Sequence, residues 1–519
     1  MQHKICIVLI VCFVVTFCSY ADKGVQLRNN TLFLAFSSEP HRINPIFVAD
    51  FNSYTVSGWI FNGLTRLDEN LQVVGDLAES WHMSDDGRTL VFKLKKGVLW
   101  HDGQEFTSQD VAFTYKVLTS FRTATPNSNR FGPVKSIDAI DPYTIKIIYK
   151  EPYGSALMSW TNGIIPEHIL KDKDIHDTSF DRSPIGTGPY KLKEWIPGQK
   201  LILSAFKKHF NGSPKIETLV IRIIPDSATR LLELKRGNID VMEATPYQYF
   251  HVNDNSHIQK YRFSPYRYGF LGFNLLDKRF KDRRIRQAIS HAIDKDAIIT
   301  SVFREAGSRS TGPYPPGSPF ESKNVQYFEY DRQRALELLK ISGWFKDKDG
   351  SLKKSGQAFQ FTLMTNYESD EHNRIAQIIQ SQLKEVGIRV IIKPLEWQTF
   401  RHTVISKHAF EAFLLSRVYL WDPDIYDLWH SSKTKEGEWN FLSYRNTIVD
   451  TLLEKGRQTI DLKKRIAIYK EVHNILAKEQ PCVFLYNVDA LFLVNKRVQG
   501  VKITPLGIYH NIKDLYINA

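Results

Sequence analysis

Hydrophobic and polar residues alternate most clearly between Gly75 and Tyr115. After turn residues at 85–87, apolar and polar side chains alternate through 90–94, which is the period of a half-buried strand. Asp102-Gly103 marks a second turn, and Thr107 to Asp110 has the spacing of a capping box at the start of a helix. We therefore predict strand, turn, strand, turn and helix along this stretch.

The rest of the chain alternates between the two periods. Strand-like patterns cover 31–36, 144–149, 192–195, 201–206, 218–224, 270–274, 359–364, 389–393 and 410–415. Helical patterns cover 54–61, 227–236, 282–299, 331–342, 372–386 and 462–479. Residues 359–393 read as strand, helix and strand, a crossover that implies parallel strands. Because the pattern changes character near Tyr268, we infer two α/β lobes, the second inserted into the first.

The first residues read as an export signal. Lys4 is followed by an apolar run from Ile5 to Phe17, which is shorter than the roughly 20 residues that span a bilayer. Ser19-Tyr20-Ala21 fits a cleavage site, so we expect a signal peptide at 1–21 and a periplasmic mature chain. No small residue precedes Cys18, which argues against a lipoprotein.

Composition is that of a folded protein with more than one domain. The chain has 519 residues, 42% hydrophobic and 24% charged. The net charge of +13 is dispersed rather than clustered, which indicates a solvated basic surface and no nucleic-acid partner. Outside the signal the only cysteine is Cys482, so we expect no intrachain disulfide and a buried thiol.

We find no catalytic or metal-binding signature. HExxH, CxxC and GxSxG are absent, and Gly307 to Gly312 lacks the Lys of a phosphate loop. His101-Asp102 fits a turn better than a base and its orienting acid. Asp422, Asp424 and Asp427 are unevenly spaced around Pro423, which favours a loop entering a helix over a metal site. We therefore expect no cofactor and no enzymatic activity.

A group of aromatic residues suggests a ligand cleft. Its members are Tyr54, Trp397, Tyr419, Trp421 and Trp429. Arg417 and Asp422 lie among them in the sequence, and aromatic rings with a few charges are typical of ligand-cleft walls. Packing in a core is the alternative for each ring.

Several motifs resemble one protein family. LAESW at 77–81 and the stretch 86–111 look like the signature of the family 5 extracellular solute-binding proteins of ABC importers. Further similar motifs are IGTGPY at 185–190, RGNID at 236–240, Phe273-Asn274, RIRQAISHAIDKDAI at 284–298 and Glu396-Trp397. The resemblance covers nearly the whole mature chain.

The resemblance implies an α/β fold of the two-lobed periplasmic-binding-protein type (class II, cluster C) with an extra subdomain in lobe I. It places lobe I at 22–266 and 487–519, with the subdomain at about 60–185. Lobe II is expected at 267–486.

The resemblance also suggests ligand-binding residues. In oligopeptide-binding relatives an extended peptide pairs with strands of both lobes. By position, Ala49 to Phe51 and Arg417 to Tyr419 resemble those strands. Asn366 and Trp397 resemble residues of side-chain pockets. With Tyr54, Trp421 and Asp422, these residues form our candidate site.

One position departs from the family pattern. Relatives place an Asp, which binds the peptide ammonium, three residues before an acidic-Pro pair. Counting back from Asp422-Pro423, that position holds Tyr419. Either Asp422 or Asp424 replaces the anchor, or the ligand has no free ammonium there.

The resemblance predicts a monomeric binding protein that captures a short peptide between two closing lobes and delivers it to an inner-membrane ABC permease. A ligand such as a nickel or other metal chelate, or an anionic solute, is the alternative within the family. A secreted hydrolase, for which no nucleophile–base pair is present, and a chaperone-like or adhesive role are alternatives from other classes.

Overall fold

The computed structural model describes residues 30–123, 125, 127–253, 257–264, 267–418 and 422–518. The chain divides into two units. Unit 1 comprises Met1–Lys150, Ala156–Arg262 and Leu491–Ala519, and unit 2 comprises Glu151–Ser155 and Phe263–Ala490. The short segment Glu151–Ser155 thus belongs to unit 2, although the chain on both sides of it belongs to unit 1.

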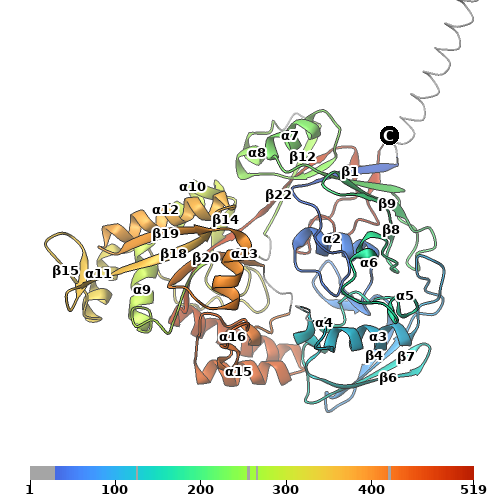
Figure 1. Ribbon diagram of the computed structural model, residues 1–519, viewed down its shortest axis with the longest axis horizontal. Coiled ribbons are helices and arrows are strands. Elements are labelled where there is room, and N and C mark those ends of the chain that lie inside the picture. Colours follow the sequence, from blue (N-terminus) through green and yellow to red (C-terminus); the bar gives the residue numbers. More distant parts are fainter. Residues whose placement is uncertain are drawn as a thin grey trace, which may run out of the picture. The chain divides into compact units, whose positions relative to one another are not determined.

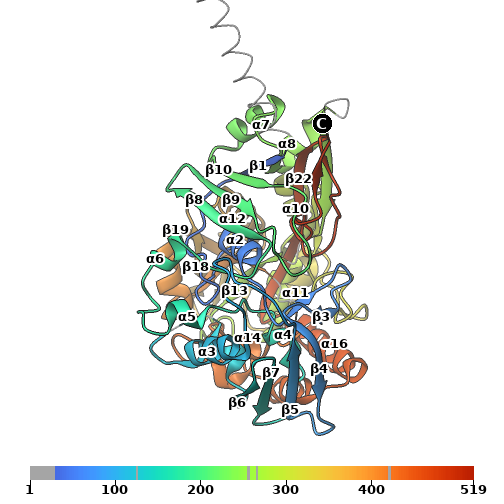
Figure 2. The same ribbon diagram turned by 90° about the vertical axis from the view of Figure 1, so that its right-hand side faces the viewer.

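Unit 1 contains two main sheets, which lie apart from each other within the unit (Figure 2). The seven-stranded sheet has the order β12 (Ile258–Phe263), β22 (Ala490–Asn495), β11 (Val241–Glu243), β1 (Thr31–Phe36), β10 (Thr218–Ile223), β9 (Lys200–Ala205) and β8 (Tyr190–Ile196). The four-stranded antiparallel sheet has the order β4 (Ala78–Met83), β5 (Thr89–Leu94), β7 (Thr144–Tyr149) and β6 (Val134–Asp141). Two-stranded ribbons are formed by β2 (Thr65–Leu67) with β3 (Val73–Gly75), and by β23 (Val498–Gln499) with β24 (Tyr516–Ile517). The α-helices are α2 (Phe51–Ile60), α3 (Ser108–Thr119), α4 (Ala156–Ser159), α5 (Glu167–Leu170), α6 (Ser179–Arg182), α7 (Ser227–Lys235) and α8 (Pro246–His251).

Unit 2 is built on one mixed six-stranded sheet (Figure 1). Its order is β14 (Gly307–Arg309), β21 (Cys482–Val488), β13 (Arg267–Phe273), β20 (Ala412–Val418), β18 (Gln360–Asn366) and β19 (Arg389–Leu395). A small sheet holds β15 (Phe345–Lys346), β16 (Leu352–Lys354) and β17 (Gln357–Ala358). The α-helices are α9 (Arg283–Ala292), α10 (Lys295–Phe303), α11 (Arg332–Ile341), α12 (Asp370–Glu385), α13 (Trp397–Phe400), α14 (Tyr426–Trp429), α15 (Thr447–Gln458) and α16 (Leu462–Glu479).

The six-stranded sheet separates two hydrophobic cores. Leu271 and Leu414 face a core shared with α9 to α12, and α12 lies along β18 and β19 (Figure 1). Phe270 and Phe413, one position away on the same strands, face a second core that includes residues of α15 and α16. Side chains therefore alternate between two buried faces, as expected for a sheet covered on both sides.

Most predicted elements are present. Thr107 and Asp110 form the capping box of α3, and the strand–helix–strand unit is β18, α12 and β19 with parallel strands. The predicted helix at 462–479 has the bounds of α16. Cys482 is a buried, free thiol, as predicted.

Two predicted elements are wrong. The single helix predicted at 282–299 is two helices, because the Asp294 carboxylate accepts a hydrogen bond from the Ala297 amide and caps α10. The segment Ala49 to Phe51 is not a strand. Asp50 caps α2 by accepting from the Ser53 amide, so Phe51 is the first helical residue.

In the described part of the chain no helix is long and apolar enough to cross a membrane. The predicted signal peptide lies outside the described residues.

Candidate functional site

The stretch Gly75–Tyr115, which carries the family-like motif, makes side-chain hydrogen bonds to other parts of unit 1. His101 Nδ1 accepts from the Gly186 amide, and Nε2 lies 2.9 Å from the Gly188 carbonyl oxygen. A Cβ on Gly186 would lie 1.8 Å from the Ile60 carbonyl oxygen, so the IGTGPY loop needs glycine there. Burial lowers the pKa of His101 to about 4, which keeps the ring neutral at physiological pH. His101 therefore has a structural role.

The candidate residues of unit 2 gather at one edge of its six-stranded sheet. β18 runs parallel to both β19 and β20, so the carboxyl ends of the three strands point the same way. Asn366 ends β18, Trp397 follows β19 by two residues, and Arg417 is next to last in β20. Ligands of open α/β sheets bind outside the carboxyl ends of strands. The fold thus brings together three candidate residues that are far apart in sequence.

At this edge β20 has a free side. β13 pairs with β20 along its whole length, from Arg267 opposite Val418 to Phe273 opposite Ala412. β18 pairs with β20 only through Leu363 opposite Ala412 and Met364 opposite Phe413. Among the described residues, no strand pairs with Leu414–Val418 on the β18 side. Unpaired strand edges are templates for another extended chain.

Arg417 lines a small, half-open pocket together with residues of the neighbouring strands β13 and β21, and none of the described residues of β18 lines it. The other lining residues are Tyr268, Phe270, Leu428, Trp429, Trp439, Phe441, Leu442 and Cys482. The Arg417 guanidinium lies 5.4 Å from the centre of the Phe441 ring. Burial raises the pKa of Tyr268 to about 12, against the opposing effect of the Arg417 charge, so the phenol stays neutral.

Trp397 and Asn366 are half-buried. The Trp397 ring stacks on Phe400 with ring centres 5.9 Å apart, and the Asn366 side chain accepts from the Glu368 amide. Both side chains therefore have local contacts and still reach the surface at the strand ends.

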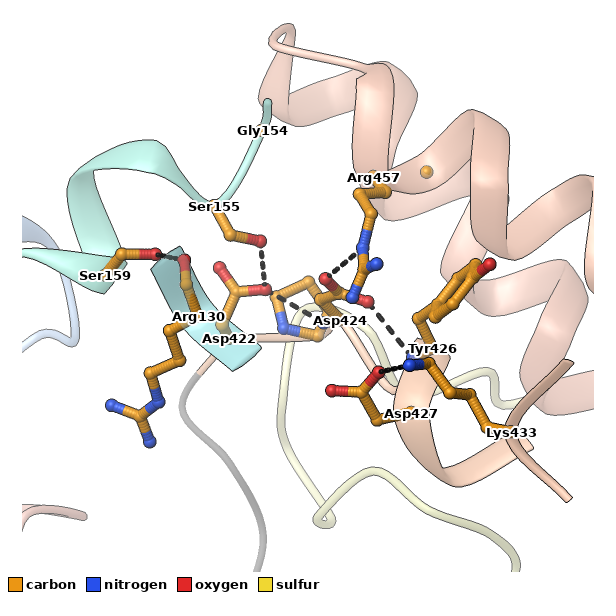
Figure 3. A network of polar contacts seen from close by, with 12 residues as sticks. Arg130, Gly154, Ser155, Ser159, Asp422, Asp424, Tyr426, Asp427, Lys433 and Arg457 are labelled. Atoms are coloured by element: carbon orange, nitrogen blue, oxygen red, sulfur yellow. Dashed lines mark hydrogen bonds and ion pairs between the residues drawn. The ribbon is translucent and has the colours of Figure 1, made fainter. Parts of the chain in front are cut away.

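Asp422 belongs to a buried polar network (Figure 3). Arg465 donates to both of its oxygens, at 2.7 and 3.2 Å, and Ser155 Oγ donates to Oδ1 at 2.8 Å. Burial alone would raise the pKa of Asp422, but the charge and hydrogen bonds of Arg465 hold it below its ordinary value. Asp422 is therefore an ionised carboxylate with both oxygens occupied.

Asp424 is the second carboxylate of this network. Arg457 Nε donates to its Oδ2 at 2.8 Å, and the Tyr426 amide donates to Oδ1 (Figure 3). Burial raises the pKa of Asp424, and Arg457 opposes that rise. The sequence did not reveal Arg457 or Arg465 as partners, since nothing in the spacing indicates which helix packs on this loop.

The remaining candidates are placed as follows. In unit 1, Phe51 and Tyr54 are exposed on the first turn of α2, with 59% and 64% of their surface accessible. Tyr419 and Trp421 lie outside the described residues. Among the described residues no group of His, Cys, Asp and Glu side chains is arranged to hold a metal ion. Sequence reasoning missed Trp439, which lines the Arg417 pocket.

The profile of the bacterial extracellular solute-binding proteins, family 5, matches residues 72–439. The chain belongs to this family. It is 31% identical over 506 residues to the oligopeptide-binding protein AppA of Bacillus subtilis, covering 95% of this chain and 91% of AppA. The two-lobed α/β fold that the sequence predicted is the fold of this family. The additional subdomain in lobe I stays a prediction.

Solved structures agree with this assignment. The AppA structure in complex with a nonapeptide has a TM-score of 0.83 at 30% identity, covering 94% of this chain and 99% of AppA. NikZ from Campylobacter jejuni in complex with Ni(L-His) has a TM-score of 0.84 at 29% identity, with coverage of 94% and 99%. These two similar structures hold different ligands, a nonapeptide in AppA and Ni(L-His) in NikZ.

Proposed function

We propose that this family 5 protein is the periplasmic binding component of an ABC import system, that it binds a short peptide, and that it delivers the peptide to an inner-membrane permease. The free side of β20 carries this proposal. A peptide lying beside Leu414–Val418 gains main-chain hydrogen bonds that do not depend on its side chains. The AppA–nonapeptide complex supports a peptide ligand.

The proposal assigns unit 1 to lobe I and unit 2 to lobe II. Asn366, Trp397 and Arg417 would contact the ligand in lobe II, and Phe51 and Tyr54 in lobe I. Tyr419, Trp421 and Asp422 stay predicted site residues, although the present partners of Asp422 leave it little capacity for a ligand ammonium. Closure of the lobes on the ligand would be the signal that the permease reads.

The protein is proposed to act as a monomer, after removal of residues 1–21, and to catalyse no reaction. Peptides recovered intact after long incubation would support the proposal that no reaction is catalysed, and cleavage products would contradict it.

Calorimetry on protein stripped of ligand by unfolding and refolding tests the peptide proposal. Di- to pentapeptides should bind, and the best binder should lose affinity when backbone amides on one side of the strand are N-methylated. N-methylation on the other side is the matched control and should have a smaller effect, because only one side faces β20. Absence of binding by every peptide would overturn the proposal.

An anionic solute or metal chelate is a second candidate. It is favoured by Arg417, for which no carboxylate partner is found among the described residues, and by the NikZ–Ni(L-His) structure. Native mass spectrometry of the co-purified ligand distinguishes the two: a peptide mass supports the first, and a metal-containing mass supports the second.

A further inference from the structure

Charges at the carboxyl edge of the unit 2 sheet are mostly paired. Arg267 Nη2 lies 3.3 Å from a Glu371 oxygen, in the strand next to β20. Arg465 is paired with Asp422, and Arg457 with Asp424. The acidic groups near the end of β20 thus already have cationic partners within unit 2.

Arg417 differs from these arginines. No Asp or Glu of the described residues forms an ion pair with it, and its cationic group lies over the Phe441 ring. A cation–π contact does not neutralise the charge. Arg374 and Arg401 likewise form no ion pair with a described residue, but they are exposed, so water solvates them. Arg417 is half-buried among aromatic rings, where solvation by water is poorer.

Arg417 belongs to the part of β20 at which we propose that the ligand binds. It lies within Leu414–Val418, the part of β20 that no described strand pairs with on the β18 side. The guanidinium itself lies in a half-open pocket with Tyr268 and Phe270 of the neighbouring strand β13. A ligand at this end of the sheet reaches the guanidinium by placing one of its groups in that pocket. A carboxylate would accept two parallel N–H bonds from an arginine, whereas an ammonium would be repelled.

We propose that Arg417 anchors a carboxylate of the ligand, so that the protein selects peptides by a negative group at this position and does not require a free ammonium. This proposal rests on the proposed function, because it assumes a ligand at the β20 edge. Asp422 is not available as a carboxylate partner for Arg417, because Arg465 and Ser155 already donate hydrogen bonds to its oxygens.

The carboxylate has two sources, the C-terminus of the peptide and an Asp or Glu side chain. Calorimetry with the best binder from the peptide series separates them. The probes are the free acid, its C-terminal amide, its Glu-to-Gln analogue where it contains Glu, and its N-acetylated form. Loss of one carboxylate should weaken binding about tenfold or more, and N-acetylation should change it little.

The variant Arg417→Gln should lose this discrimination, binding the acid and the neutral analogue equally. Arg417→Lys retains the charge and should restore part of the preference, which also controls for folding. The matched control is Arg389→Gln, an exposed arginine at the amino end of β19 and hence at the opposite edge of the same sheet. It should leave the preference unchanged.

The outcomes separate the inference from the proposed function. If no peptide binds the wild-type protein, the proposed function fails. If peptides bind but every neutral analogue binds as well as its acid, or if N-acetylation abolishes binding, the peptide function stands and the role of Arg417 is overturned. Equal discrimination by wild type and Arg417→Gln overturns it as well.

Discussion

The stretch Gly75–Tyr115 of unit 1 and the carboxyl edge of the unit 2 sheet differ in how far their polar groups are paired within the protein. In unit 1, the stretch Gly75–Tyr115 has polar side chains that are paired within the unit: His101 contacts the IGTGPY loop with both ring nitrogens, and Asp110 completes the capping box of α3. Among the described residues of unit 2, Leu414–Val418 has no strand partner on its β18 side, and Arg417 has no carboxylate partner. The first region specifies a fold, and the second has groups that a ligand can satisfy.

The buried network beside the open edge gives the largest expected effect. Arg465→Met should lower the free energy of unfolding by about 3–5 kcal/mol, because it leaves the Asp422 charge buried without its partner. Urea unfolding of the full chain, monitored by the hydrogen exchange of unit 2 amides, measures the change. The double variant Arg465→Met/Asp422→Leu should recover part of the loss, and a single variant as stable as wild type would contradict the assignment.

One added methyl group should destabilise the IGTGPY loop of unit 1. Gly186→Ala should cost about 3 kcal/mol, because its Cβ would overlap the Ile60 carbonyl oxygen. Gly58→Ala is the matched control in α2, since nothing lies within 4 Å of its added Cβ. It should gain roughly 0.5–1 kcal/mol from helix propensity. Urea unfolding of unit 1 compares the two, and similar stabilities would show that the loop tolerates a side chain.

Stability should depend on pH through the buried His101. Its pKa falls from the ordinary 6.5 to about 4 in the folded protein, because burial disfavours the charged ring. Between these values the unfolded chain binds a proton that the folded protein does not. The free energy of unfolding should therefore fall as pH decreases from 6.5 to about 4, by up to roughly 3 kcal/mol. The free energy of unfolding, measured at several pH values, should fall less steeply with decreasing pH for His101→Gln than for the wild type. An equal dependence on pH in the two proteins would contradict this prediction.

The smallest effect on stability is expected at the open edge. Arg417→Met should change the free energy of unfolding by no more than about 0.5 kcal/mol, because no ion pair between Arg417 and another described residue is lost. Thermal unfolding without ligand measures it. A loss of stability comparable to that of Arg465→Met would show that Arg417 stabilises the folded protein, and would contradict the view that it is left for a ligand.

Local elements were predictable where their partners are near in sequence. The α3 capping box and the crossover from β18 through α12 to β19 follow from short patterns. The break at Asp294 was missed because the apolar period continues through it, and only the cap of α10 shows where one helix ends and the next begins.

The site was less predictable because its determinants are long-range. Asn366, Trp397 and Arg417 were named from a family resemblance, and only the parallel strands place them at one edge. The pairing of Asp422 with Arg465 joins residues 43 apart. The return of Glu151–Ser155 to unit 2 has no sequence signal either, since these contacts depend on the tertiary fold.

Amide hydrogen exchange with and without a bound peptide tests the central claim most directly. We predict that binding slows exchange in Leu414–Val418, where the peptide pairs with β20, and leaves the amides of Gly75–Tyr115 unchanged. Unchanged exchange in Leu414–Val418 at saturating peptide would contradict the claim that this strand edge binds the ligand.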